Sequence, residues 1–465
     1  MNRALLIVVS LFLIMLAPEL FSEGMFMDGL IYSSVSRNLA EGIGTIWEPS
    51  FSQDYGASFY GHPPLMFVLQ AFFFNLFGDY FWVERLFPLM VSLLTVVGIH
   101  TAWKSLGGTS TNSWFPVLLW IFMNELVWAC ANNMLENTMT FFLIWFLVFY
   151  LRSRNGQARA ILFKCLSGIC IVFAFYVKGP VALFPIAFPF VLFINKRLGF
   201  RQMLVDSLWL GLIVLFSFLM PYLLSENAAV FWNSYWELQI LKGAGASATV
   251  ESRWFIIGAF FKGIAIPSVL CFVVILLAGK WTSFSSVVVK NKWSLSLFFI
   301  ALCGVVPMMI SVKQRGFYIL GVYPYMSLCL GLLAEGAVSV LSNRLKQRKS
   351  FVLGRTVLSN LLLIIGIAMN LIFWGKPSRD IDKIKDVEVL TQHIDARTSV
   401  GIPKTLRSDW SLRGYCQRMG KISLDDKTAE ERDWYLSRIS DPVPGIDYEF
   451  VSIELESYKL YKKIN

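Results

Sequence analysis

The sequence predicts an all-α polytopic membrane protein of about eleven transmembrane helices, followed by a small α/β soluble domain. The first reason is composition: 56% of the 465 residues are hydrophobic and 15% are charged, against about 25% charged in an ordinary soluble protein. The second is a series of long apolar runs, and the third is a change to polar sequence after residue 375. We therefore expect a membrane domain at 1–375 and a small extracytoplasmic domain at 376–465.

Each predicted span is an apolar run of about 17–25 residues, the length needed to cross about 30 Å of hydrocarbon. The two runs that flank Lys178 also fit one broken helix, so the expected count is about 10–13. The first run lacks a small-x-small cleavage site after Leu16, which indicates an uncleaved anchor rather than a signal peptide. The eleven runs lie near 4–22, 86–104, 113–131, 135–151, 159–177, 179–195, 204–224, 256–279, 295–312, 316–340 and 353–374.

Lys and Arg placement predicts the orientation. With the N-terminus in the cytoplasm, 17 cations of the membrane domain fall on the cytoplasmic side and eight on the other, as the positive-inside rule requires. An odd number of spans then places the tail on the periplasmic side of the inner (plasma) membrane. The net charge of +10 is accordingly a consequence of topology and requires no nucleic-acid partner.

Cysteine and histidine placement gives no sign of a disulfide framework or a paired metal motif. Six of the seven cysteines fall in or beside predicted spans, and Cys416 stands alone in the tail. The three histidines, His62, His100 and His393, are too scattered for a zinc signature based on spacing.

The first outer loop, at about 23–85, is long and rich in acidic residues. Apolar residues recur at near-helical spacing over 28–41, which predicts an amphipathic helix. The segment 64–77 is strongly apolar and begins with the helix-starting pair Pro63 and Pro64. We expect an interfacial helix on the outer leaflet, or a short re-entrant one. In the tail, we expect helices at 381–396 and 425–440 and a strand-like end.

Ionisable residues in or beside the spans are the clearest functional signal, because such groups are expensive in a membrane. Carboxylates together with a cluster of cations indicate an outward-facing polar cavity suited to an anion such as phosphate. The predicted topology places six such residues on the same outer face: Asp28, His62, Glu136, Lys178, Lys313 and Arg315.

Other interpretations stay open for single residues. A lone Lys or Arg at the end of a span is most often an anchor whose charged end reaches the interface, and Asp28 in a loop is most often solvated. The aromatic segment 231–239 is either an interfacial belt or a platform on which a sugar stacks. Glu125 and Glu335 lie inside predicted spans, where we assign them no role beyond contact with a neighbouring helix.

Four ordered segments carry a family resemblance. They are MDGLIYSSVSRNLAEG with YGHPPLMFVLQAFFFNLFG, then LENTMTFFLIWFLVFYL, FAFYVKGPVALFP and KQRGFYILGVYPYMSLCLG. Together they resemble the dolichyl-phosphate-mannose–protein mannosyltransferase superfamily, which includes the lipid A aminoarabinose transferases. The resemblance implies the GT-C fold of membrane glycosyltransferases, and its segments cover most of the membrane domain.

The resemblance also implies roles for individual residues. Asp28 matches the family's catalytic aspartate, and His62 matches the Lys or His that precedes a Pro pair near the donor phosphate. Glu136 stands where the family has a catalytic Asp. Phosphate binding is implied for Lys178, Lys313 and Arg315, and a position along the cavity for Tyr60, Tyr318 and Tyr323.

The sequence departs from the family pattern at three positions. Gly29 replaces the second acid of an acidic pair, and Glu136 replaces an Asp. Gly61 stands where the aminoarabinose transferases have a Glu, which removes a possible metal ligand. We therefore expect no required metal and no cofactor.

The resemblance implies transfer of a sugar from a polyprenyl-phosphate donor to a lipid (lipid A-like), glycan or protein acceptor on the outer face, with inversion. Fixed cations would stabilise the leaving phosphate, and Asp28 would act as general base toward the acceptor hydroxyl. The alternatives are a transporter or flippase of lipid-linked sugars and a non-catalytic sugar- or lipid-binding relative. The charges lie at outer span ends rather than at the midplane where transporters bind substrate, which favours the enzyme.

Overall fold

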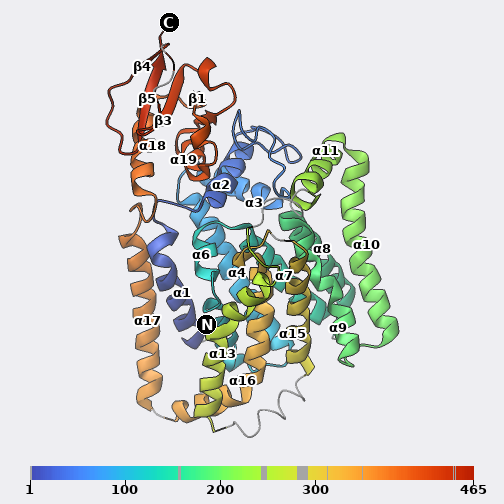
Figure 1. Cartoon of the computed structure of the whole chain (residues 1–465). Coiled ribbons are helices and arrows are strands. Elements are labelled where there is room, and N and C mark those ends of the chain that lie inside the picture. The colour runs from blue at the N-terminus through green and yellow to red at the C-terminus, as the bar shows by residue number, and fades with distance from the viewer. Residues whose placement is uncertain are drawn as a thin grey trace. The chain divides into compact units, whose positions relative to one another are not determined.

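The computed structural model describes residues 3–154, 159–241, 249–279, 292–311, 313–347, 349–442, 445 and 447–464. The chain forms two compact units (Figure 1). The first comprises Met1–Ala17, Gly61–Leu65 and Pro88–Ile372, and the second comprises Pro18–Tyr60, Met66–Phe87 and Phe373–Asn465. The second unit begins its last segment close to the boundary expected at 375, but it also contains most of the first outer loop. Four cations used for the orientation, Lys242, Lys280, Lys290 and Arg348, lie outside the described residues.

The chain is a multi-pass membrane protein. Within the described residues, nine helical segments are long and apolar enough to cross a membrane. They are Arg3–Leu20, Val83–Ser105, Leu135–Ser153, Ala160–Ile194, Phe200–Leu224, Phe255–Leu277, Lys292–Ile310, Gly316–Leu345 and Leu353–Ile372.

The helices of these segments and their shorter neighbours have the following bounds: α1 Arg3–Leu20, α3 Leu65–Phe77, α4 Val83–Ser105, η1 Ser110–Asn112, α5 Trp114–Ile121, α6 Leu126–Ala131, α7 Leu135–Ser153, α8 Ala160–Lys178, η2 Gly179–Ala187, α9 Phe188–Ile194, α10 Phe200–Leu224, α11 Glu226–Tyr235, η3 Trp236–Leu241, α13 Phe255–Leu277, α15 Lys292–Val305, η5 Val306–Ile310, η6 Gly316–Val322, α16 Tyr323–Lys346 and α17 Lys349–Ile372.

The difference between eleven expected spans and nine observed has two local causes. The run at 113–131 is divided into α5 and α6, because the chain turns between them and Glu125 adopts a left-handed conformation with φ of 63°. The two runs around Lys178 form one segment in which α8, η2 and α9 follow without a connecting loop. The broken-helix interpretation of that pair is therefore correct.

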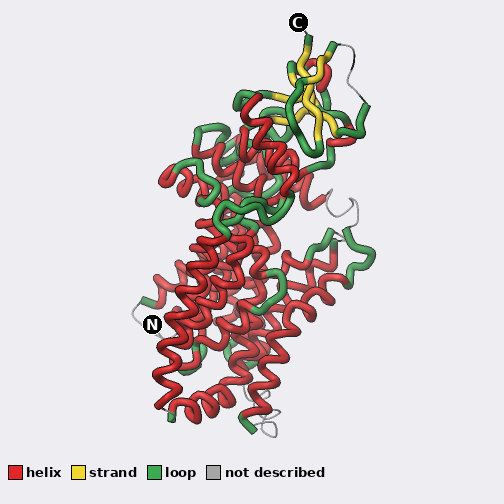
Figure 2. The backbone as a smooth tube through the Cα atoms, turned by 90° about the vertical axis from the view of Figure 1, so that its left-hand side faces the viewer, coloured by secondary structure: helices red, strands yellow, loops and turns green. Residues whose placement is uncertain are grey.

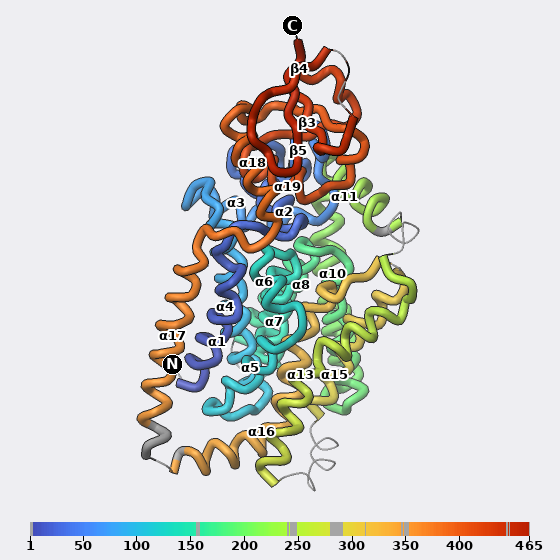
Figure 3. Tube along the Cα trace, turned by 60° about the vertical axis from the view of Figure 1, so that its left-hand side comes forward, coloured from blue at the N-terminus to red at the C-terminus, as the bar shows by residue number. Residues whose placement is uncertain are grey.

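Burial separates inner from outer helices of the first unit. In the apolar stretch of α7, 78% of the residues are buried, and in that of η6 with α16 the share is 83%. The corresponding shares are 22% for α10 and 17% for α17. Figure 1 shows α10 and α17 on opposite flanks of this unit. The α17 helix lies beside α1 (Figure 3), where Asn370 Nδ2 donates to the Leu13 carbonyl oxygen at 3.0 Å. The outer helices present Leu, Ile and Phe side chains outward, as lipid contact requires.

The second unit contains all the described strands, drawn in yellow in Figure 2. They form one five-stranded sheet in the order β2-β1-β3-β5-β4, in which β1 is parallel to β2 and β3, and β5 is antiparallel to β3 and β4. The helices are α2 Met27–Ala40, η7 Lys404–Leu406, α18 Ile381–His393, α19 Trp410–Gly420 and η8 Ala429–Glu431, and the strands are β1 Ser399–Gly401, β2 Ser423–Asp425, β3 Trp434–Arg438, β4 Tyr448–Phe450 and β5 Tyr458–Lys463.

One hydrophobic core joins the first loop to the tail. Met25 and Leu30 from the loop are buried with residues of α18, α19 and the sheet, including Val387, Leu412 and Leu460. The α2 helix packs on α19 and is buried along most of its length, so it is an internal helix of this unit rather than one lying on a membrane surface. In contrast, α3 exposes apolar side chains such as Phe72, at 63%, as an interfacial helix would.

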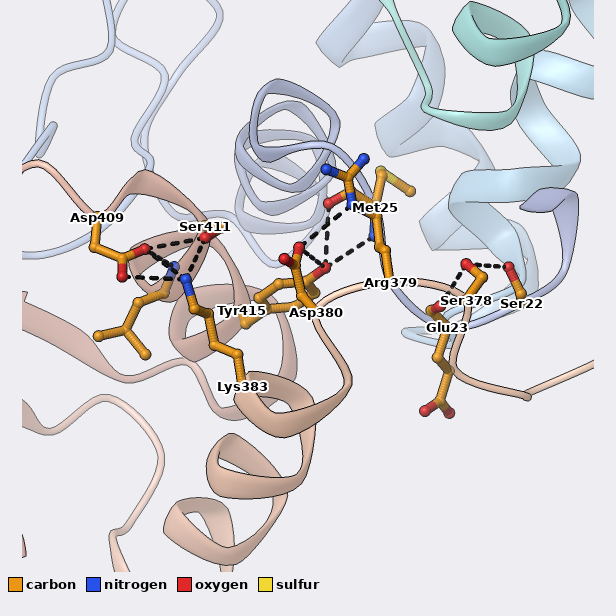
Figure 4. A network of polar contacts seen from close by, with 12 residues as sticks. Ser22, Glu23, Met25, Ser378, Arg379, Asp380, Lys383, Asp409, Ser411 and Tyr415 are labelled. Carbon is orange, nitrogen blue, oxygen red and sulfur yellow. Dashed lines mark hydrogen bonds and ion pairs between the residues drawn. The ribbon is translucent and has the colours of Figure 1, made fainter. Parts of the chain in front are cut away.

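Polar contacts reinforce the same junction (Figure 4). The Ser22 hydroxyl donates to Ser378 Oγ at 2.8 Å. The Tyr415 hydroxyl accepts from the Met25 N–H at 3.1 Å and lies 3.0 Å from Asp380 Oδ2. Because the Ser22–Ser378 and Met25–Tyr415 contacts join groups that are 356 and 390 residues apart in the chain, the loop and the tail stabilise one another.

The tail departs from expectation in two segments: α19 forms at Trp410–Gly420, where no helix was expected, and 425–440 lacks the expected helix. The helix expected near 381–396 and the terminal strands are present, but 425–440 is not helical: it contains the end of β2, η8 and β3. The Asp425 carboxylate accepts hydrogen bonds from the Lys427 and Thr428 N–H groups, which forms a turn where a helix was expected.

Candidate functional site

A cavity of about 520 Å³ lies within the first unit, a size typical of ligand pockets. One part of its wall is apolar and is formed by η2, the end of α15 and η5. The apolar and small lining residues are Pro180, Val181, Leu183, Phe184, Cys303, Gly304, Pro307, Met308 and Ile310. The remaining lining residues carry polar atoms: His62, Lys178, Tyr235, Gln239, Ser311, Lys313 and Tyr318.

Lys178 reaches this cavity because α8 ends there. Gly179 follows it with a φ of 72°, a conformation that glycine adopts at no steric cost. A Cβ at Gly179 would lie 2.2 Å from the Tyr235 hydroxyl oxygen. Glycine at 179 therefore both ends the helix and lets the Tyr235 side chain approach the backbone beside Lys178.

Glu136 forms an ion pair with Lys178. The Glu136 side chain is fully buried and that of Lys178 is 8% exposed, so the pair is largely removed from water. Glu136 lies in the first turn of α7, where the helix dipole favours a negative charge. Its Oε2 atom is buried and has no hydrogen-bond partner, so Oε1 provides the contact that holds the Lys178 ammonium.

The other polar groups complete the cationic part of the cavity. Lys178 Nζ lies 5.1 Å from the centre of the Tyr318 ring, within cation–π range. Lys313 is exposed, and its backbone N–H donates to Ser311 Oγ at 3.0 Å. Burial, followed by the charges of Lys178 and Lys313, holds the pKa of His62 well below its usual value of 6.5. His62 is therefore neutral at pH 7 and offers one N–H donor, while the two lysines supply positive charge.

The structure brings together only part of the set expected from the sequence. His62, Lys178, Lys313 and Tyr318 line the same cavity, and Glu136 contacts it through Lys178. Two expected residues are not among its lining. Arg315 is exposed outside it. Tyr323 is 1% exposed, with its hydroxyl group packed against Gly263. Two more belong to the second unit: Tyr60, and Asp28 in the first turn of α2.

Three lining residues, Tyr235, Gln239 and Ser311, were not expected. Tyr235 and Gln239 come from the aromatic segment 231–239, for which a belt and a stacking platform were both open. Trp232 in this segment is fully buried and stacks on Phe175, with ring centres 5.2 Å apart. The segment therefore anchors α11 in the core. Tyr235, whose ring centre lies 5.6 Å from that of Trp232, continues this aromatic contact to the cavity wall, and Gln239 follows it.

The arrangement suits a lipid with an anionic head group. Lysine ammonium groups bind phosphate well, and the apolar wall provides a surface for a hydrocarbon chain. Within the described ranges, no group of three or more His, Cys, Asp or Glu residues is placed to hold a metal ion.

Comparison with known proteins concerns the family signature and the fold. Residues 61–224 match the family model described as dolichyl-phosphate-mannose-protein mannosyltransferase. Among curated protein sequences, none matches the chain.

Solved structures match over nearly the whole chain. ArnT from Cupriavidus metallidurans bound to undecaprenyl phosphate is similar with a TM-score of 0.67 and 15% identity, covering 98% of this chain and 97% of ArnT. Its apo state gives a TM-score of 0.69 and 14% identity over the same shares. AglB, the oligosaccharyltransferase of Archaeoglobus fulgidus, in complex with an inhibitory peptide and a dolichol-phosphate, gives 0.55 and 12%, covering 94% of this chain and 69% of AglB.

The fold is therefore that of the GT-C membrane glycosyltransferases. The resemblance stated from the sequence is confirmed: this fold extends over the chain, and residues 61–224 carry the signature of the mannosyltransferase family.

Proposed function

We propose that the protein transfers a sugar from a polyprenyl-phosphate donor to an acceptor on the extracytoplasmic face of the inner membrane. The observation that carries the proposal is the cavity of the first unit, where an apolar wall meets Lys178, Lys313 and His62. A polyprenyl phosphate has the same two parts, a hydrocarbon chain and an anionic head. ArnT, which shares the fold, has been crystallised with undecaprenyl phosphate, and this supports the same class of donor here.

In this proposal the cavity acts on the leaving group. As the glycosidic bond breaks, negative charge grows on the phosphate oxygen, and ammonium groups fixed in a water-poor cavity stabilise that charge. Lys178, held by Glu136, is the fixed cation, and Lys313 is the second. Neutral His62 donates a hydrogen bond without adding charge.

Asp28 is the proposed base. It lies in the first turn of α2, and its carboxylate would accept the proton of the acceptor hydroxyl as that oxygen attacks the anomeric carbon. Attack opposite the leaving phosphate inverts the configuration at this carbon. The acceptor is proposed to be a lipid of the lipid A type, a glycan or a protein.

The test is transfer of a radiolabelled sugar from a synthetic polyprenyl-phosphate donor by protein reconstituted in liposomes. We expect Asp28→Asn and Lys178→Ala each to abolish transfer. Lys104→Ala is the matched control, because Lys104 is an exposed cation at the far end of α4 and should leave transfer unchanged. Wild-type activity in both site variants would refute the proposal. Movement of the donor across the membrane without its consumption would identify a flippase instead.

A further inference from the structure

Gln314 stands out in the segment that carries Lys313. It is 1% exposed although both of its neighbours, Lys313 and Arg315, are exposed cations. A buried amide must satisfy its hydrogen bonds inside the protein, so its partners show what this side chain holds in place.

The Gln314 side chain makes four hydrogen bonds, all to backbone groups. Its Nε2 donates to the carbonyl oxygens of Ser311 at 2.7 Å, Arg253 at 3.1 Å and Met308 at 3.2 Å. Its Oε1 accepts from the Ile256 N–H at 2.9 Å. Three carbonyl acceptors and one N–H donor define the orientation of the amide, because the reverse orientation would place the amide oxygen against three carbonyl oxygens.

The Gln314 backbone is held as well. Its N–H donates to Thr249 Oγ1 at 2.9 Å, and the Thr249 hydroxyl donates to the Gln314 carbonyl oxygen at 3.0 Å. Residue 314 is thus fixed to the segment that leads into α13 by both its backbone and its side chain.

These contacts end at the wall of the cavity. Met308, Ser311 and Lys313 all line it, and Gln314 bonds directly to the first two. The Ser311 hydroxyl in turn accepts from the Lys313 N–H at 3.0 Å. The backbone that carries the exposed Lys313 side chain is therefore fixed to the start of α13 through one amide.

We propose that Gln314 is a positioning residue of the donor site: it fixes the backbone at Met308 and Ser311 and so holds Lys313 where the donor phosphate binds. This inference rests on the proposed function and deepens it, because it concerns recognition of the phosphate head group in the same cavity. Gln314 itself does not line the cavity, so it acts through Lys313 and Ser311. A long flexible lysine binds an anion tightly only if its backbone is already fixed, since otherwise the backbone must be ordered on binding as well as the side chain, which costs free energy.

Two substitutions separate this role from general packing. Gln314→Glu keeps the size and the acceptor for Ile256 but places a carboxylate oxygen against three carbonyl oxygens. Gln314→Ala removes all four bonds. Thr249→Val removes only the two hydrogen bonds between the Thr249 hydroxyl and the Gln314 backbone. It is a milder change that can still be measured if the two Gln314 variants are insoluble. We expect the affinity for undecaprenyl phosphate to fall about tenfold to a hundredfold in the Gln314 variants, and by a smaller factor in Thr249→Val.

Binding of undecaprenyl phosphate is measured by the change in tryptophan fluorescence of purified protein, and KM and kcat are measured for donor and acceptor separately. The KM for the donor should rise while the KM for the acceptor stays constant. The Lys313→Ala/Gln314→Ala double variant should bind as weakly as Lys313→Ala alone, because both changes remove one function. If Gln314 only supported packing, the losses of affinity from the two single substitutions would multiply in the double variant, and this result would overturn the inference.

Two further outcomes are distinct. Wild-type protein that binds no undecaprenyl phosphate would refute the proposed donor and this inference with it. Wild-type protein that binds, together with Gln314 and Thr249 variants of equal affinity, would refute the positioning role alone and leave the proposed function standing.

Discussion

The ion pair between Lys178 and Glu136 gives the sharpest test of the site, because it has both a structural and a functional consequence. Glu136 is fully buried and Lys178 is 8% exposed. Replacing Lys178 by Met leaves a buried carboxylate without its partner. Loss of one partner of a buried pair costs about 3–5 kcal/mol of unfolding free energy. We expect the lower end, about 3 kcal/mol, since Lys178 lines the cavity and its side chain keeps 8% of its surface exposed.

The double variant Lys178→Met/Glu136→Leu separates the two consequences. It removes both charges and leaves side chains of similar volume, a replacement that is often neutral for stability. Thermal unfolding in detergent should therefore show a lowered midpoint for Lys178→Met and a recovered midpoint for the double variant. Binding of undecaprenyl phosphate should be lost in both, because neither has the ammonium group.

Two results would refute this reasoning. A Lys178→Met variant as stable as wild type would show that Glu136 does not depend on Lys178 for its charge. Recovery of donor binding in the double variant would show that Lys178 holds Glu136 rather than the phosphate.

Three other predictions concern different parts of the chain. The pKa of His62 is held well below 6.5 in the folded protein, so below about pH 6.5 the unfolded chain takes up a proton that the folded chain does not. Wild type should therefore lose stability relative to His62→Gln as the pH falls. Thermal midpoints measured from pH 8 to 5 for both proteins test this. Gly179→Ala should destabilise the protein by about 1–3 kcal/mol from its positive-φ backbone conformation alone, with a further loss from contact with Tyr235 that Tyr235→Phe partly restores in thermal unfolding. In the second unit, Arg418 pairs with buried Glu84, and Arg418→Met should cost about 3–5 kcal/mol, seen as faster proteolysis of the tail.

Each of these has a contradicting outcome. Parallel pH profiles for wild type and His62→Gln would mean that His62 titrates normally in the folded protein. Equal thermal midpoints for Gly179→Ala and wild type would mean that residue 179 does not require a positive φ. An unchanged rate of tail proteolysis in Arg418→Met would show that Glu84 is satisfied by water.

The membrane helices could be predicted from sequence because span length and apolar composition are local properties. The break at Glu125 could not, since a left-handed residue between α5 and α6 depends on tertiary contacts such as the Asn124 N–H to the Gly263 carbonyl oxygen. The unexpected helix α19 has a similar cause. It contains Gly414, which disfavours helices, yet a Cβ there would lie 2.9 Å from Leu30 Cβ. Packing against α2 thus overrides local propensity.

The residues of the candidate site also divide into those that the sequence could indicate and those that it could not. Lys178, His62 and Lys313 could be singled out from the sequence because an ionisable group beside an apolar span is costly and therefore conspicuous. Tyr235 and Gln314 were not, because a tyrosine in an aromatic segment and a glutamine between two cations have no distinctive pattern. Their importance depends on partners that only the folded chain provides, Gly179 for Tyr235 and four backbone groups for Gln314.

The shared core of the first loop and the tail has a consequence for biosynthesis. Residues 18–60 and 66–87 leave the ribosome early, but their partners begin only at Phe373. At about 5–20 residues per second, synthesis of the intervening chain takes on the order of 15–60 s. Throughout that time Met25, Leu30 and the rest of the loop's apolar face have no core to join. The nascent loop is therefore a natural client for a chaperone, and a stop codon before the tail would produce a loop that remains unfolded rather than a protein that lacks only its last domain.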